Sequence, residues 1–359
     1  MNTYNLPAPT IPNGRLYMDA TTYTGNGAST ASIYNAATFQ PDFIWIKNRS
    51  SAYGPLLYNS IVGAGTGSTN TALSSAGNGS ESGGNAGSTY GYLSSFNSNG
   101  FTATKGSDAT SYTNGSGQTY VAWQWQAGAG TTSTNTAGTI TSTVSANTSS
   151  GFSIVAYNGN GTTNTVGHGL GLTPAFIIAK TRSTTGDWLV YHQSLGSNYY
   201  LYLDNTTAIS SSTPGYWGTP STTTFGVLGG GYGNNISGAT MIAYVWAPIP
   251  GFSAFGSYTG NGSATGPFVY TGFRPKFLMI KRTDAISSWS MIDSSRTQYN
   301  PVGEFINADT TGAGSVYSGL NFLSNGFANI WSDVSTNASG GTYIYMAFAE
   351  NPFKYSNAR

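Results

Sequence analysis

Apolar residues in this chain come in short runs separated by turns rich in Gly, Asn, Ser and Thr. One run recurs at 41–47, 174–180 and 275–281, each time as a proline followed by aromatic and β-branched residues and a closing lysine. Proline suits the entry of a strand, and an unbroken apolar run too short for a helix indicates a buried strand. We predict three buried central strands whose lysines reach water along their apolar stems.

The three strands belong to a longer repeat. Upstream of each lies a Tyr-x-Gly-Asn-Gly turn, and downstream a β-rich strand begins with threonine. The turns are at 23–27, 157–161 and 258–262, and the downstream strands begin at Thr119, Thr240 and Thr342. The separations are nearly constant, except that the first copy carries an insertion. Because Asn-Gly is a strong hairpin signal and no GKS or GKT follows, we predict that the turns close β-hairpins rather than phosphate-binding loops.

Short strands, polar turns and the lack of any amphipathic helix indicate an all-β chain. We predict three tandem antiparallel β-sandwich domains, of jelly-roll or concanavalin-like type, placed in line. The segments are an extended N-terminal arm (1–16), a first repeat with a long Gly/Ser loop (17–126), a Thr/Ser/Gly linker (127–150), a second repeat (151–247) and a third repeat (251–355).

Several segments carry further expectations. The proline-punctuated arm is either an attachment arm or a disordered terminus. The tract from Gly63 to Asn85 has almost no apolar side chains, so we expect a solvated and disordered loop. In the linker, the alternation at 139–144 could instead add one strand to a neighbouring sheet. The stretches 187–191 and 288–293 should pair as hairpins with the lysine strands before them.

The amino-acid composition excludes several classes of binding partner. Only 7% of residues are charged, the net charge is +1, and Lys and Arg form no cluster, so we expect no nucleic-acid partner. The chain has no cysteine, which excludes disulfides and thiolate metal sites. No apolar run approaches the ~20 residues of a membrane helix, and the first residues lack the features of a secretory signal. We therefore expect neither membrane insertion nor secretory export.

The sequence gives little support for a catalytic function. The two histidines, His168 and His192, have no carboxylate or second histidine at ligand spacing, so a structural role is the better interpretation. The acidic residues are scattered through turns, whereas a glycosidase needs two carboxylates facing each other across a cleft. We predict no catalytic residue, no metal site and no cofactor.

Aromatic residues are the remaining candidates for function. Sugar rings stack on Trp and Tyr while their hydroxyl groups bond to neighbouring polar side chains. Most tryptophans lie in core-strand patterns, which favours packing. The candidates outside those patterns, for glycan binding or for a subunit interface, are Tyr199, Tyr200, Tyr216, Trp217 and Trp331.

Some stretches resemble a known family. They are the segment from Gly251 to Gly262 (GFSAFGSYTGNG), the segment 266–275 (GPFVYTGFRP) and the segment 340–353 (GGTYIYMAFAENPF). These resemble an uncharacterised tandem β-domain that is found in structural proteins of tailed, mostly aquatic, bacteriophages. Residues 151–180 resemble the repeat that usually precedes it. The resemblance covers 138–355 well, and the first repeat only through its spaced motifs.

The resemblance implies a non-enzymatic structural protein on the virion surface, on tail or capsid, assembled in the host cytoplasm. We expect a homotrimer that contacts other virion proteins and attaches, as a tail fibre or receptor-binding protein, to host surface polysaccharide. The alternative is a capsid decoration protein, because the chain has no coiled-coil or collagen-like shaft. A glycan depolymerase and a secreted bacterial adhesin are further options.

Overall fold

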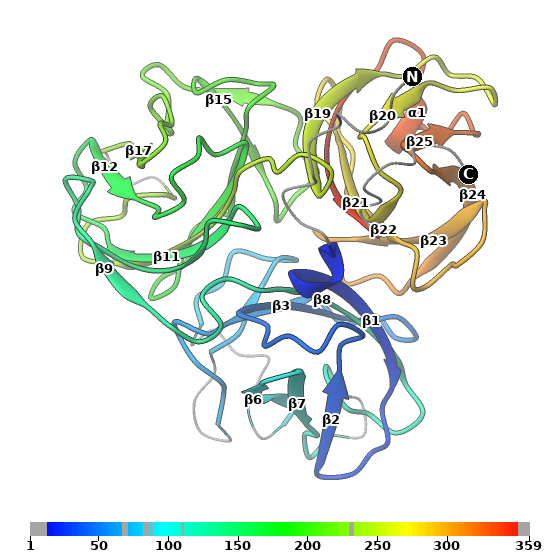
Figure 1. Cartoon of the computed structure of the whole chain (residues 1–359), viewed down its shortest axis with the longest axis horizontal. Helices are drawn as coiled ribbons and strands as arrows, with labels where there is room; N and C mark the ends of the chain where they lie inside the picture. The colour runs from blue at the N-terminus through cyan, green and yellow to red at the C-terminus, as the bar shows by residue number, and fades with distance from the viewer. Residues whose placement is uncertain are drawn as a thin grey trace, which may run out of the picture.

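The computed structural model describes residues 13–66, 71–81, 87, 89–108, 111–229 and 233–350. These residues form antiparallel β-sheets, a 3-10 turn η2 (Gly14–Leu16) and one short helix α1 (Val334–Asn337) (Figure 1). The predicted all-β fold is confirmed. Of the predicted N-terminal arm, residues 1–12 lie outside the described residues, as do 351–355 of the third repeat.

We call residues 17–126, 127–247 and 251–350 units one, two and three. Unit one has a five-stranded main sheet of order β1-β8-β3-β4-β5 and a second sheet of order β2-β7-β6. The strands are β1 (Met18–Thr24), β2 (Thr30–Tyr34), β3 (Phe43–Asn48), β4 (Leu56–Asn59), β5 (Leu73–Ser74), β6 (Tyr92–Asn97), β7 (Gly100–Thr104) and β8 (Thr119–Trp125).

Unit two has an eight-stranded main sheet of order β16-β15-β14-β13-β18-β11-β10-β9, and β12 pairs with β17 in a second sheet. The strands are β9 (Ser133–Asn135), β10 (Ser142–Asn147), β11 (Phe152–Asn158), β12 (Asn164–Gly167), β13 (Phe176–Thr181), β14 (Leu189–His192), β15 (Tyr199–Tyr202), β16 (Ser210–Ser211), β17 (Thr224–Val227) and β18 (Thr240–Trp246). The segment 127–150, interpreted from the sequence as a linker or an added strand, thus contains β9 and β10 and extends this sheet.

Unit three has strands in the order β19-β26-β21-β22-β23-β24-β25-β20. They are β19 (Ser253–Thr259), β20 (Phe268–Tyr270), β21 (Pro275–Arg282), β22 (Trp289–Asp293), β23 (Val302–Asn307), β24 (Ser315–Leu323), β25 (Gly326–Asn329) and β26 (Thr342–Ala349). The order β1-β8-β3-β4-β5 of unit one recurs as β11-β18-β13-β14-β15 and as β19-β26-β21-β22-β23 in the other two units. In unit three β23 also pairs with β24, so the main sheet continues into the second sheet β24-β25-β20. In each unit the lysine strand (β3, β13 or β21) pairs with the next strand as a hairpin, as predicted, and its other neighbour is the closing strand.

The lysine strands are buried on both faces. In β3, Ile44 and Ile46 pack under the second sheet of unit one, while Phe43 and Trp45 point the other way. The equivalent residues of β13 and β21 divide in the same manner between an inner core of their own unit and a shared cluster. A strand with two apolar surroundings needs no polar position, which explains the unbroken apolar run.

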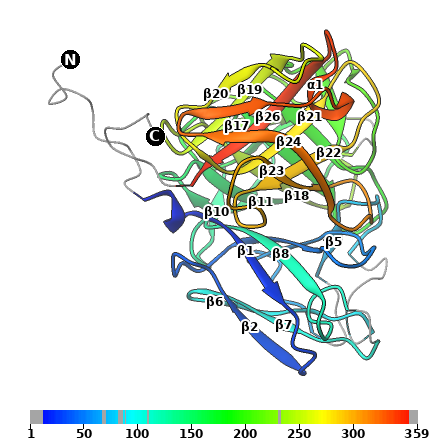
Figure 2. The same ribbon diagram turned by 90° about the vertical axis from the view of Figure 1, so that its right-hand side faces the viewer.

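The units lie around a common centre and not in line, so that part of the prediction is wrong. The apolar faces that each main sheet turns away from its own second sheet form one cluster (Figure 1). Phe43 of unit one stacks on Tyr244 of unit two at 4.2 Å between ring centroids. Trp125 contacts both Trp246 of unit two and Phe277 of unit three. Figure 2 shows the second sheet of unit one on the outer side of its main sheet.

The lysines that close the three central strands do not reach water, contrary to the prediction. Lys47, Lys180 and Lys281 are fully buried on the side of the strand that faces the neighbouring units. Each amine donates to a backbone carbonyl of another unit: Lys47 to Thr311 at 2.7 Å, Lys180 to Asn78 at 3.1 Å and Lys281 to Thr206 at 3.0 Å. The lysine of unit one therefore bonds to unit three, that of unit two bonds to unit one, and that of unit three bonds to unit two. Burial lowers the pKa of Lys47 to about 7 and that of the other two to about 8.

A second polar contact crosses each boundary in the opposite direction. It uses the last residue of β4, β14 and β22. Asn59 donates to the Tyr244 hydroxyl, His192 bonds the Tyr345 carbonyl, and Asp293 accepts from the Trp123 indole. The three positions are equivalent in register but differ in chemistry, so each boundary has its own polar pairing.

The long Gly/Ser loop is not wholly solvated. Residues 67–70, 82–86 and 88 lie outside the described residues, but 71–81 is held between units. Leu73 is buried in the shared cluster, and Glu81 forms a two-point ion pair with Arg182 of unit two. Unit three makes the equivalent contacts with unit one, where the Thr311 carbonyl accepts from Lys47 and Glu304 of β23 pairs with Arg49. Composition missed this because the segment is held by a single apolar anchor, Leu73, together with the Asn78 carbonyl and the Glu81 carboxylate.

The Gly-Asn-Gly turns are sandwich corners and not hairpins. The strands on either side of each turn belong to different ladders: β1 pairs with β8, whereas β2 pairs with β7. A buried asparagine five positions before each closing strand fixes the corner. Its amide oxygen accepts from the central Asn backbone N–H at 2.9–3.0 Å, in the pairs Asn114 with Asn26, Asn235 with Asn160 and Asn337 with Asn261.

Both glycines of the corner are required. A Cβ on Gly25 would lie 2.1 Å from the Gly115 carbonyl oxygen. Gly27 has a φ of 67°, in the left-handed region that favours glycine. The motif that the sequence marks as a hairpin is therefore a close approach of two backbone segments.

The buried amine of Lys47 can be tested by Lys47→Met, which keeps the apolar stem. We expect the free energy of unfolding to fall by about 2–4 kcal/mol, because the carbonyls of Tyr53 and Thr311 lose a charged donor. Chemical denaturation measures the change. Lys105→Met, at a partly exposed position, is the control, and an equal loss in both variants would contradict the assignment.

The role of the buried asparagine at the Gly-Asn-Gly corner can be tested by Asn235→Ala. We expect a loss of about 2–3 kcal/mol in unfolding free energy, because the N–H of Asn160 and the carbonyl of Thr162 lose their partner. Asn158→Ala, at an exposed strand end, should change stability by less than about 1 kcal/mol. If the two variants unfold at the same denaturant concentration, the hydrogen bonds of Asn235 do not stabilise the corner.

Candidate functional site

The aromatic residues proposed from the sequence have different surroundings. Trp217 and Tyr216 are buried in the core of unit two. Tyr200 is half-buried and meets the Tyr216 ring edge-on at 4.7 Å. Tyr199 and Trp331 are exposed, but they belong to units two and three and do not share a site. Tyr199 and Trp331 are thus the candidates whose rings are open to a ligand, and a binding role for them stays a prediction.

Two pockets lie near these residues. One, of about 530 Å³, lies in unit two and is lined entirely by uncharged side chains, among them Asn164, Asn198 and Pro214. The other, of about 180 Å³, is bordered by Trp331 and Asp333 in unit three. Neither gathers the proposed aromatic residues around one space.

A third pocket is lined by several charged side chains. It is a groove of about 550 Å³ between units one and three, lined by Arg15, Asp19, Ala20, Thr21, Thr22, Tyr34, Ala36, Lys276, Ser294, Ser295, Gln298, Tyr299 and Glu350. In a chain with few charged residues, four of them line this one groove. We call it the one–three groove.

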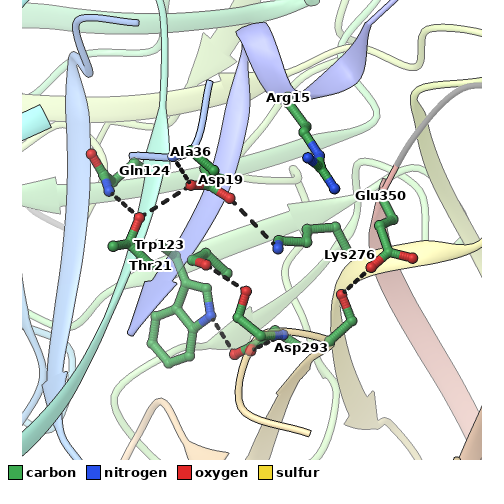
Figure 3. A network of polar contacts seen from close by, with 12 residues as sticks. Arg15, Asp19, Thr21, Ala36, Trp123, Gln124, Lys276, Asp293 and Glu350 are labelled. Atoms are coloured by element: carbon green, nitrogen blue, oxygen red, sulfur yellow. Dashed lines mark hydrogen bonds and ion pairs between the residues drawn. The ribbon is translucent and has the colours of Figure 1, made fainter. Parts of the chain in front are cut away.

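On the unit-one side, Asp19 is fixed by β1 and by the turn after β2. The carboxylate is buried and accepts from the Ala36 N–H at 2.8 Å and the Thr21 hydroxyl at 3.2 Å (Figure 3). Gln124 in turn donates to the Thr21 hydroxyl. Lys276 of β21 reaches the other Asp19 oxygen at 3.6 Å across the unit boundary.

Below the groove, Asp293 ties the two units together. It accepts from the Trp123 indole at 2.9 Å and from Arg296, a pair that is wholly buried. Burial acts to raise the pKa of Asp293, but Arg296 and the indole outweigh it, so this pKa lies below its usual value. Ser295 donates to the Ala20 carbonyl at 2.6 Å. The floor of the groove is therefore rigid.

On the unit-three side, Glu350 follows β26. It forms an ion pair with Arg274 and accepts from the Ser294 hydroxyl at 2.9 Å. Arg15 lies in η2 at the edge of the groove. Figure 3 shows its guanidinium pointing toward the side where Lys276 and Asp19 meet.

Two tyrosines stand at the rim. Tyr34, at the end of β2, is 62% exposed, and Tyr299, in the turn after β22, is 81% exposed. Exposed aromatic rings beside fixed polar groups are what a sugar-binding surface needs, since one side of a sugar ring is apolar and its edge carries hydroxyls.

Sequence reasoning missed this site. Position 276 is lysine where the other repeats have Asp42 and Ala175, and that difference was the available signal. Nothing in the sequence brings Tyr34 and Tyr299 together, because the units are distant in the chain and meet only in the folded molecule.

Both histidines have structural surroundings. His192 is buried, its Nε2 bonds the Tyr345 carbonyl at 3.1 Å, and its Nδ1 accepts from the Ser194 N–H. His168 has the same arrangement with Ser221 and Leu170. The bonds fix the neutral tautomer with the proton on Nε2. Burial lowers the pKa of His168, and it lowers that of His192 to about 4.

Within the described residues, no group of three or more His, Cys, Asp or Glu side chains is placed to hold a metal ion. Among those same residues, no helix is long and apolar enough to cross a membrane.

Comparison with known proteins gives a family. The family model described as "Domain of unknown function (DUF7483)" matches residues 13–352. The chain belongs to this family. Because the DUF7483 match includes all three units, it describes the whole three-unit body and not one repeat. No curated protein matches.

A solved structure described as "Life in the extremes: atomic structure of Sulfolobus Turreted Icosahedral Virus" was also found. It has 11% identity, covers 92% of this chain and 88% of its own, and has a TM-score of 0.13. A likeness this weak carries no argument. The DUF7483 assignment supports the uncharacterised-family part of the sequence interpretation, and the bacteriophage part stays a proposal.

The pKa of His192 predicts acid sensitivity. Its pKa in the folded state (about 4) lies below that of an unfolded chain, so the stabilisation is complete above pH ~6.5 and is lost as the pH falls toward 4. Between pH 7 and 5 we expect a loss of about 2 kcal/mol from this residue. Asparagine stands at the equivalent position of unit one, so His192→Asn should unfold with a smaller pH dependence in urea titrations. Parallel curves for both proteins would rule His192 out as the source.

Proposed function

We propose that this protein is a structural protein of the bacteriophage virion surface, a tail fibre or receptor-binding protein, and that its one–three groove binds host surface glycan. The observation that carries the glycan-binding part is the groove, which pairs two exposed tyrosines with charged and hydroxyl groups held in place by both units. The virion assignment rests on the sequence resemblance.

The chemistry of the groove suits a carbohydrate. The rings of Tyr34 and Tyr299 offer apolar surface at the mouth, and Thr22, Ser295 and Gln298 offer hydrogen-bonding groups along the wall. Because Asp19 and Asp293 are anchored by several bonds each, the wall needs little reorganisation on binding.

The remaining parts of the proposal rest on the sequence analysis. The protein acts without catalysis, is assembled in the host cytoplasm, forms a homotrimer and contacts other virion proteins. A depolymerase is the less favoured option: of the groove carboxylates, Asp19 is held by Lys276, Thr21 and Ala36, and Glu350 by Arg274 and Ser294. Both therefore serve as structural acceptors.

A capsid decoration protein is the second candidate. Its support is the approximate threefold arrangement of the units about one core, since such a body is suited to a threefold position on a shell (Figure 1). Immunogold labelling of purified particles separates the two: label confined to tails supports the first candidate, and label over the shell supports the second.

Glycan binding can be tested by Tyr34→Ser and Tyr299→Ser. We expect each to weaken binding of an oligosaccharide found on a host-glycan array by about fivefold or more, because a stacking face is lost. Isothermal titration calorimetry measures the change. Tyr270→Ser removes an exposed tyrosine outside the groove and is the control. Equal affinity in all three variants and the unmodified protein would exclude the groove as the site.

A further inference from the structure

We propose that the one–three groove selects glycans that carry a carboxylate, such as uronic-acid chains, and that Arg15 receives the acid group. This inference rests on the glycan-binding function proposed above. It concerns which class of sugar the groove prefers, and three observations support it.

The first observation is the balance of charges. Each carboxylate in or below the groove has a cationic partner: Asp19 has Lys276, Glu350 has Arg274 and Asp293 has Arg296. Arg15 is the cation left over, since among the described residues its guanidinium has no hydrogen bond or ion pair and its Nε is buried without a partner. A charged donor that is partly desolvated and unpaired favours an anionic ligand.

The second observation is that Arg15 is held at the groove. Asn13 caps the turn by accepting from the Arg15 N–H at 3.1 Å, and the Tyr17 carbonyl accepts from the Gln126 N–H. The Tyr17 ring packs edge-on against Phe252 of unit three at 6.2 Å. The turn is therefore fixed to both units, and the guanidinium points into the network from above (Figure 3).

The third observation is the geometry of the ligand class. A guanidinium presents parallel N–H groups that match the two oxygens of a carboxylate. Lys276 lies in the same lining, and its ammonium offsets the negative charge of Asp19, so Asp19 repels an incoming acid less than a free carboxylate would. Tyr34 and Tyr299 line the same groove and offer exposed rings on which the sugar rings would stack.

The experiment compares binding of an oligogalacturonate and of the same oligosaccharide after carboxyl reduction. Unmodified protein should bind the acidic form about tenfold or more tightly than the reduced form, and its affinity should fall as NaCl is raised. Arg15→Gln should lose this preference, whereas Arg15→Lys should keep part of it. Lys105→Gln removes the same charge outside the groove and should behave as the unmodified protein. Unfolding curves of each variant confirm that it is folded.

The outcomes separate the two proposals. If both oligosaccharides bind equally and Arg15→Gln changes neither affinity, the selection for acid is wrong while glycan binding stands. If Arg15→Gln and Lys105→Gln weaken acidic binding alike, the effect is one of net charge and the assignment to Arg15 is wrong. If neither these oligosaccharides nor any glycan on an array binds, the proposed function itself fails.

Discussion

The structure depends on the burial of apolar surface on both faces of three main sheets. Each unit covers only one face of its main sheet with its own second sheet. The other face carries large aromatic side chains such as Trp45, Trp125, Trp246 and Phe277. Left in water, such a face would be strongly unfavourable, and packing the three faces together removes this surface at once. The units are thus parts of one core, although each has a small core of its own.

Polar contacts follow from that arrangement. Where the apolar faces meet, side chains at equivalent positions must find partners across a boundary, since buried donors and acceptors are costly when unpaired. The closing lysines find their partners in the neighbouring unit on one side. Asn59, His192 and Asp293 find theirs in the neighbouring unit on the other side. The same scheme repeats three times with different residues, which makes the three boundaries similar in geometry and different in chemistry.

The candidate groove is a consequence of this difference. Only at the boundary of units one and three do η2, β1 and the turn after β22 bring Asp19, Lys276 and Arg15 to one surface. The equivalents of Lys276 are Asp42, which accepts from the backbone N–H groups of Ala127, Ala129 and Gly130, and Ala175, which is buried. A structural position in two repeats thus becomes part of a surface site in the third. Threefold packing thus provides the frame of the molecule, and a departure from that symmetry shapes the groove that we propose for glycan binding.

The sequence by itself determined the all-β class, the threefold repetition, the central strands and their hairpin partners, because these depend on local apolar patterning and on spacing along the chain. It also marked the Gly-Asn-Gly motifs, although their role as corners depends on Asn114, Asn235 and Asn337, which pack against them from more than seventy positions away. Only the tertiary structure decided that the units surround a common centre, that the closing lysines are buried, and that Arg15, Tyr34 and Tyr299 share a groove. Those facts arise from packing between units, and a pattern read along one strand does not reveal which surface will cover its second face.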